Sequence, residues 1–280
     1  MAKKALVTVL IGDKVTAEWN VFFRASWERY AEKHDYDIIT ITRHLDDSPR
    51  GLGRTANWQK LLIMRDPRVQ QYDDVVWMDS DLLINYNSAP CIVGSHNSAK
   101  VGLVSNRNAY FLSPEKRDNL LDRMVAPRKY SFEHIYKAAE LPPGVEDYSN
   151  TGVMVLKPKE HTVHLEYVYD NFEENPGSAK EESPLSYSLY KNDLVQPIDP
   201  RFNRCWIYEV IEKYPLLLSV SARENQILMI CCTTAAWANS YFTHFTGDWL
   251  SKDGKGVYQM RQDVRFVDQN FHNVLAFSQL

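Results

Sequence analysis

Two carboxylates separated by one residue, Asp79 and Asp81, follow an apolar run at residues 75–78. Such a run predicts a buried strand, and in open parallel sheets ligands bind beyond the carboxyl ends of the strands. If the chain bends at Ser80, both carboxylates can reach one cation such as Mn²⁺ or Mg²⁺, whose remaining ligands are typically water and phosphate oxygens. The tripeptide alone is common in solvated loops, so the buried strand before it is the feature that favours a metal site.

Two further segments place polar residues beside apolar ones. His244 lies among aromatic residues. It is either a structural histidine or, because neutral imidazole is a good Mn²⁺ ligand, the residue that completes an Asp, Asp, His set. Asn150 and Gly152 stand at the start of an apolar run at residues 152–156. They form either a plain turn or a place where Asn150 faces a sugar and Gly152 leaves room for it.

The elements that must position these residues alternate between strand and helix in the first half of the chain. Strands are expected at residues 5–11, 37–42 and 73–84, and helices at residues 16–34 and 54–65. Later strands are expected at residues 101–105 and 152–156, and helices at residues 115–125, 131–140 and 161–174. The alternation predicts a mostly parallel sheet covered by helices. No long linker interrupts it, which indicates two lobes of one domain with a boundary near Asn85.

Aromatic residues recur at intervals of three and four in the first expected helix, at Trp19, Phe22, Phe23, Trp27 and Tyr30. This spacing is typical of the buried face of a helix, so we interpret these residues as core and not as ligands. Trp58 and Trp77 are interpreted in the same way, as structural residues whose loss would reduce stability more than activity.

Composition excludes several classes of function. The net charge of −4 is spread along the chain without a block of five like charges, which argues against a nucleic-acid partner. No apolar run approaches the roughly 20 residues that span a bilayer, and residues 1–12 fit a buried first strand better than a signal sequence. The four cysteines show no CxxC spacing, which favours a reducing compartment and a cytoplasmic location.

Four segments together carry a family resemblance. Residues 75–81, 150–155, 197–203 and 244–247 resemble, in this order, the signature blocks of glycogenin-like glycosyltransferases with the GT-A fold. Residues 58–61 also resemble the block before the Asp-x-Asp motif of galactosyl-, xylosyl- and mannosyltransferases related to the yeast mannan enzymes. The resemblance implies an α/β fold: a Rossmann-like, mostly parallel central sheet with flanking helices and an abutting smaller sheet on the acceptor side. Residues 1–84 would form the nucleotide-sugar-binding lobe of a single catalytic domain, and residues 85–280 the acceptor-binding lobe.

The activity that this resemblance implies is a Mn²⁺- or Mg²⁺-dependent transfer of a sugar from a nucleotide diphosphate, usually UDP, to a glycan, protein or lipid-linked acceptor. Retention at the anomeric carbon is expected. Asp79 would contact the ribose and the metal, and Asp81 and His244 would ligate the metal. The other donor-binding positions implied are Ile11, Gly12, Asp13, Lys60, Ser80, Gly247 and Lys252. At Leu250 the family normally has a lysine, and the first lysine here is Lys252.

The acceptor side has no literal copy of the family's Asp-Gln pair, and Glu181 and Glu182 occupy the comparable place. Glu182, Asp248 and Asn150 are the candidate catalytic residues. A retaining front-face route needs no dedicated base, whereas an inverting route needs a carboxylate on the opposite face of the sugar. An alternative for Glu181 and Glu182 is a solvated helix start. Two other functions stay open: an inactive sugar-nucleotide-binding relative and an Asp-x-Asp phosphotransferase.

Overall fold

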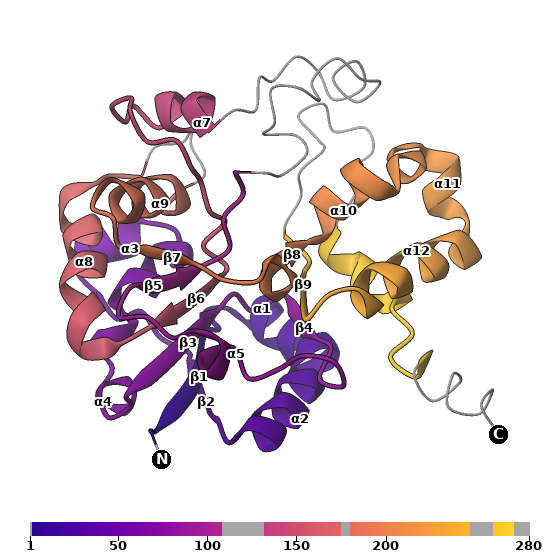
Figure 1. Ribbon diagram of the computed structural model, residues 1–280, viewed down its shortest axis with the longest axis horizontal. Coiled ribbons are helices and arrows are strands. Elements are labelled where there is room, and N and C mark those ends of the chain that lie inside the picture. The colour runs from indigo at the N-terminus through magenta and orange to yellow at the C-terminus, as the bar shows by residue number, and fades with distance from the viewer. Residues whose placement is uncertain (1, 108–131, 175–179, 247–259, 272–280) are drawn as a thin grey trace.

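A six-stranded sheet forms the centre of the larger part of the molecule, on the left of Figure 1. The structure is a computed structural model that describes residues 2–107, 132–174, 180–246 and 260–271. The strand order is β2-β1-β3-β6-β5-β7. The strands are β1 (Lys4–Val9), β2 (Asp37–Ile41), β3 (Asp74–Met78), β5 (Val101–Leu103), β6 (Val153–Leu156) and β7 (Val195–Pro197). Only β6 runs antiparallel to its neighbours, so the expected mostly parallel sheet is confirmed.

Helices cover both faces of this sheet because its strands are apolar on both sides. Alternate residues of β3 point into two separate cores, Val75 and Trp77 into one and Val76 and Met78 into the other. One face packs against α8 (Pro158–Asn171), α9 (Glu182–Lys191) and the 3-10 helix η2 (Ala56–Arg65). The other face packs against α1 (Asp13–Glu18), the π-helical turn η1 (Trp19–Phe23) and α2 (Arg24–His34).

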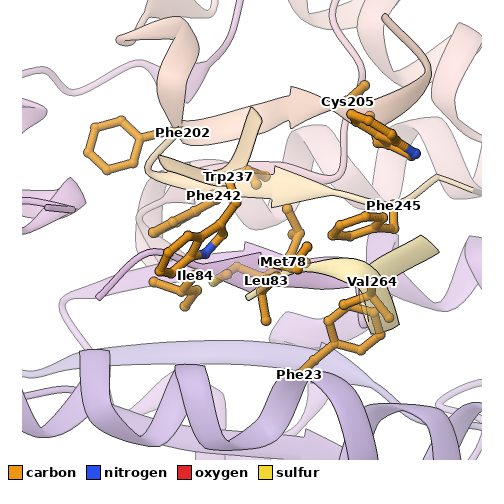
Figure 2. Packing of buried hydrophobic residues seen from close by; sticks show 14 of the residues in the cluster. Phe23, Met78, Leu83, Ile84, Phe202, Cys205, Trp237, Phe242, Phe245 and Val264 are labelled. Atoms are coloured by element: carbon orange, nitrogen blue, oxygen red, sulfur yellow. The ribbon is translucent and has the colours of Figure 1, made fainter. Parts of the chain in front are cut away.

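A second, three-stranded sheet abuts the second face, as the resemblance implies. Its order is β4 (Leu82–Ile84), β9 (Phe242–His244) and β8 (Arg204–Cys205). Phe245, which follows β9, packs with Phe23 of η1 and with Trp206, in the same core as Val264 (Figure 2). These aromatic contacts hold the end of β9, the middle strand of this sheet, in place.

Helices beside the small sheet form the rest of this part of the molecule, on the right of Figure 1. They are the 3-10 helix η4 (Pro200–Asn203), α10 (Trp206–Lys213), η5 (Pro215–Leu218), α11 (Val220–Glu224), α12 (Gln226–Ala238) and η6 (Met260–Phe266). Short helices elsewhere are α3 (Pro49–Gly53), α4 (Pro67–Gln70), α5 (Ile92–Ser95) and α7 (Phe132–Ala138).

Several expected boundaries were wrong. The first helix begins at Asp13, three residues earlier than expected, and contains a π-helical turn within its aromatic stripe. The helix expected at residues 54–65 is a 3-10 helix, and the one expected at residues 161–174 begins at Pro158, which is favoured at a first helical position. The strand expected at residues 73–84 is two strands in different sheets. The helix expected at residues 115–125 lies outside the described residues.

No helix within the described ranges is long and apolar enough to cross a membrane. All four cysteines are described, and none forms a disulfide. Cys231 and Cys232 lie within α12. The cytoplasmic location stays a prediction from the sequence.

Candidate functional site

The Asp79-Ser80-Asp81 segment connects the two sheets. It leaves the end of β3 and enters β4, and backbone hydrogen bonds hold it on both sides. The Asp79 nitrogen donates to the Gly152 carbonyl at 2.8 Å, and the Phe245 nitrogen donates to the Asp81 carbonyl at 2.9 Å. The Asp79 side chain is 25% exposed and that of Asp81 only 6%. The two carboxylates are therefore held at the carboxyl edge of β3, where the parallel-sheet rule places ligands.

Strand pairing brings His244 to these carboxylates. In the antiparallel pairing of β4 with β9, His244 stands opposite Leu82, the residue after Asp81. Its Nε2 lies 3.1 Å from Asp81 Oδ1 and 3.7 Å from Asp79 Oδ2. Asp79, Asp81 and His244 are the group within the described chain whose ligand atoms gather within 4.8 Å of one another.

The donor set fits a divalent cation. An ion with ligand bonds of about 2.1 Å places neighbouring ligand atoms about 3 Å apart, close to the separations of Nε2 from the two carboxylates. Two carboxylates and one imidazole suit Mn²⁺ or Mg²⁺, with open positions for water or phosphate oxygens. On the other side of the ring, His244 Nδ1 lies 2.9 Å from Asn203 Oδ1, so a hydrogen bond orients the imidazole.

Glycine is needed at position 152 because of the nearby His244 imidazole, and not because of a sugar. A Cβ at this position would stand 2.2 Å from Cε1 of His244 and 2.7 Å from its Nδ1. The expectation that Gly152 leaves room for a sugar was therefore wrong, because the imidazole occupies that space. Any side chain at this position would displace the third member of the cluster.

Arg261 is a site residue that the sequence did not reveal. Its Nη2 donates to Asp81 Oδ2 at 2.8 Å and its Nε to the same oxygen at 3.1 Å. Its Nη1 lies 3.5 Å from Oε2 of Glu18, the last residue of α1. Arg261 stands 180 residues from Asp81 in a short 3-10 helix without a motif, so no local signal could have found it.

The charges of these groups reinforce one another. Burial would raise the pKa of Asp81, but His244 and Arg261 outweigh it and hold that pKa at about 2. Burial would lower the pKa of His244, but the charge of Asp81 and the hydrogen bond to it raise that pKa well above its usual value. Without a cation the cluster is therefore an ion pair, and a divalent cation would take the place of the imidazole proton.

Lys60 is buried in contact with the carboxylates of Asp79 and Glu181, and it does not reach the protein surface. Its Nζ is 2.8 Å from Glu181 Oε1, 3.2 Å from Asp79 Oδ1 and 3.5 Å from Thr151 Oγ1, and its side chain is 2% exposed. Burial would lower the pKa of Lys60, but the charges of Asp79 and Glu181 raise it. The ammonium group therefore positions Asp79, which is a less direct role than the donor-binding position that the resemblance implies.

Trp77 also contacts Asp79. It is 3% exposed and packs in the core, as expected, but its indole Nε1 donates to Asp79 Oδ1 at 3.1 Å. The interpretation of Trp77 as purely structural was therefore incomplete. Trp58 is fully buried, and Trp19, Phe23, Trp27 and Tyr30 are buried in the core, as predicted.

Glu181 and Glu182 begin α9 but are not a solvated helix start. Glu181 is 2% exposed, and its Oε2 has no hydrogen-bond partner. Glu182 Oε2 accepts from Asn150 Nδ2 at 2.6 Å, and Oε1 accepts from the Tyr148 hydroxyl. Burial raises the pKa of Glu182 to about 7, although Lys60 opposes the shift. Glu182 can therefore hold a proton near neutral pH, as a general acid or base must.

Glu182→Gln should change how stability depends on pH. A carboxyl whose pKa is raised on folding stabilises the protein fully below its unfolded value of 4.5, and this contribution is lost as the pH rises through 7. Urea denaturation should therefore show the variant more stable than wild type by roughly 3 kcal/mol at pH 8, with little difference at pH 4.5. Glu146→Gln, at an acid whose side chain is 79% exposed, is the control. Parallel pH profiles for Glu182→Gln and wild type would contradict the raised pKa.

The remaining predicted residues divide into two groups. Ile11, Gly12 and Asp13 follow β1 at the same edge of the sheet as Asp79, and Gly12 adopts φ 100°, which favours glycine. Ser80 forms the turn between the two carboxylates. Gly247, Asp248 and Lys252 lie outside the described residues.

Comparisons with solved structures identify the architecture. A glycosyltransferase involved in the glycosylation of the major capsid of PBCV-1 aligns with a TM-score of 0.52, 12% identity, and 95% and 100% of the two chains. This chain has the GT-A fold. In this GT-A fold the Asp79 segment lies where the central and small sheets meet.

Two further solved structures are less similar to this chain. The bifunctional glycosyltransferase WbbM, in its apo structure, gives a TM-score of 0.48 at 12% identity over 94% of this chain and 49% of that one. An active-site mutant of LgtC gives 0.43 at 11% identity over 94% of each chain. No protein-family model matches the sequence, and no curated protein is detectably similar to it. The fold is thus shown by structure, and the function must be argued from the site.

Proposed function

We propose that this protein is a metal-dependent glycosyltransferase that moves a sugar from a nucleotide-diphosphate donor to a glycan, protein or lipid-linked acceptor. The observation that carries the proposal is the meeting of Asp79, Asp81 and His244, from distant parts of the chain, at the edge of the sheet of a GT-A fold. A UDP-sugar is the first donor to test and retention the expected outcome, because the signature blocks resemble those of glycogenin-like enzymes.

Asp79, Asp81 and His244 would hold Mn²⁺ or Mg²⁺. When bound, the cation supplies positive charge where the departing diphosphate becomes negative. The exposed part of the Asp79 carboxylate would face the donor, while Lys60 and Trp77 contact its Oδ1. Asp81 is buried and held by Arg261. In this proposal Asp79 contacts both the ribose and the metal, as the resemblance implies.

Glu182 is the carboxyl that we assign to proton handling or to stabilising the sugar. It lies close enough to Asp79 and His244 for their charges to affect its pKa. Asn150 orients it through the hydrogen bond from Nδ2. In a retaining route the leaving phosphate oxygen takes the acceptor proton, and a protonated Glu182 then serves as a hydrogen-bond donor.

The geometry restricts the phosphotransferase alternative to one oxygen atom. An aspartyl nucleophile needs a free, accessible carboxylate oxygen. Asp81 is buried against His244 and Arg261, and Lys60 and Trp77 both contact Oδ1 of Asp79, so Asp79 Oδ2 is the oxygen left for such a role. An inactive sugar-nucleotide-binding relative would share all of these contacts, so binding and turnover must be measured separately.

The deciding experiment combines calorimetry with a donor panel. Titration of UDP and GDP is expected to show binding of UDP that requires Mn²⁺ and disappears in EDTA. Incubation with UDP-sugars should then release UDP, in slow hydrolysis without acceptor. Binding without release for any sugar, with acceptors present, would favour the inactive relative, and binding unaffected by EDTA would exclude the metal-dependent mechanism.

His244→Ala tests the third ligand. Loss of the imidazole should weaken Mn²⁺ by roughly 10–100-fold and reduce UDP release by a similar factor, while the fold is retained. His161→Ala is the matched control, because His161 is equally buried but bonds to the Lys157 nitrogen and the Ala99 carbonyl, remote from the cluster. Equal Mn²⁺ affinity in the His244→Ala variant and in wild type would remove His244 from the site.

A further inference from the structure

We infer that Asn203 is a positioning residue that fixes which nitrogen of His244 faces the metal and that links His244 to Glu182 through Asn150. This inference deepens the proposed function and rests on it. The residues form one continuous chain of hydrogen bonds: Glu182, Asn150, Asn203 and His244. The resemblance gave no role to Asn203, which ends η4 in the block at residues 197–203.

The direction of the hydrogen bonds begins at a backbone group. The Gly152 nitrogen donates to the Asn150 side chain at 3.0 Å, and a backbone N–H can only donate. The Asn150 atom that receives it must therefore be the carbonyl Oδ1 and not the amide nitrogen. The Asn150 Nδ2 group is then the one that faces Glu182 Oε2, at 2.6 Å, which also agrees with an acceptor carboxylate.

Asn203 continues the same direction. One end of its amide lies 3.0 Å from the Asn150 carbonyl oxygen and 3.0 Å from Asn150 Oδ1. Both are acceptors, so this end must be the donor Nδ2. Asn203 Oδ1 is then the atom 2.9 Å from His244 Nδ1, and it accepts the Nδ1 proton. A different arrangement would leave two acceptors facing each other in a buried place.

The consequence for His244 follows from the chemistry of imidazole. A neutral ring carries one proton, and a proton on Nδ1 leaves the Nε2 lone pair free to bind a cation. Nε2 is the nitrogen that faces Asp79 and Asp81. The other described partner of Nδ1 is Cys205 Sγ at 3.9 Å, a much weaker acceptor than an amide oxygen. Asn203 therefore determines the tautomer that ligates the metal.

Burial makes this network effective. Asn203 is 5% exposed, Asn150 8% and His244 1%, so water does not compete readily for their hydrogen bonds. The side chain of Asn150 forms hydrogen bonds with Glu182, Gly152 and Asn203. It is accordingly a positioning residue as well, and a direct contact with a sugar is not the role that its bonds favour.

Nitrogen-15 NMR of the histidine rings and Mn²⁺ titration test the inference together. In metal-free wild type, the His244 Nδ1 proton should be observed and protected from exchange. With Mg²⁺ the ring should be the neutral tautomer that is protonated on Nδ1. Asn203→Leu, which keeps the volume but offers no acceptor, should lose the protected proton and bind Mn²⁺ roughly 10–100-fold more weakly. Asn203→Asp keeps an acceptor and should retain the proton.

The control is Asn85→Leu. Asn85 is fully buried, and its Nδ2 donates to the Trp237 carbonyl. This variant should lose stability yet keep the His244 proton and the Mn²⁺ affinity. If Asn203→Leu does not fold, Asn203→Ser gives the same two readouts. A protected Nδ1 proton, or Mn²⁺ affinity within twofold of wild type, in Asn203→Leu or in Asn203→Ser would overturn the role of Asn203.

The two levels of inference can fail separately. If wild type binds no divalent cation, the proposed function fails, and the protected proton in the metal-free protein still decides whether Asn203 holds His244. If wild type and Asn203→Leu bind Mn²⁺ equally, the role of Asn203 is wrong, while the metal site stands.

Discussion

Asp81→Ala is expected to abolish Mn²⁺-dependent UDP binding, the largest effect on binding that the site predicts. Asp81 contributes one oxygen beside His244 and one beside Arg261. Without it, the cation loses the more buried of its two carboxylates, and one carboxylate alone is left to offset the charge of the metal. Calorimetry with UDP and Mn²⁺ should show no heat of binding at concentrations that saturate wild type.

Folding must be measured in the same variant. Removal of Asp81 leaves the cationic groups of His244 and Arg261 without their partner, which costs on the order of 3–5 kcal/mol when a buried pair is broken. Asp74→Ala is the matched control, because Asp74 is a buried acid at the other end of β3 that pairs with Lys157. It should lose stability and keep metal-dependent binding. Wild-type UDP affinity in folded Asp81→Ala would refute the metal bridge.

Lys60→Met is expected to cause a loss of stability as large as that of Asp81→Ala. The methionine retains the apolar stem but removes the charge that lies between Asp79 and Glu181. Glu181, at 2% exposure, then becomes a buried carboxylate without a cation. Urea denaturation near neutral pH should show a loss on the order of 3–5 kcal/mol.

The double variant distinguishes an ion pair from simple packing. Lys60→Met combined with Glu181→Gln removes both buried charges and should recover much of the lost stability, so the two changes will not be additive. Nucleotide binding should remain weaker than in wild type, because Asp79 has lost a positioning partner. If the stability lost in the double variant equals the sum of the losses in the two single variants, Lys60 and Glu181 are not energetically coupled.

The sequence by itself determined the local features of this protein. A continuous apolar run followed by two carboxylates, at residues 75–81, predicted a buried strand that ends in a site, because polarity is a property of neighbouring residues. The blocks in order predicted the GT-A fold, and with it the grouping of Asp79, Asp81 and His244. The structure agrees on the fold and brings the three side chains together.

Only the tertiary structure decided how distant segments meet. The antiparallel direction of β6 puts Asn150 and Gly152 beside the end of β3. The His244 imidazole occupies the space that a side chain at Gly152 would need. Packing against distant elements also buries Glu181 and brings Arg261 to Asp81. Strand direction and register depend on non-local hydrogen bonds and packing, which no window of sequence contains. For the same reason, the donor and the acceptor of each hydrogen bond from Gly152 through Asn203 to His244 could be assigned only from the tertiary structure.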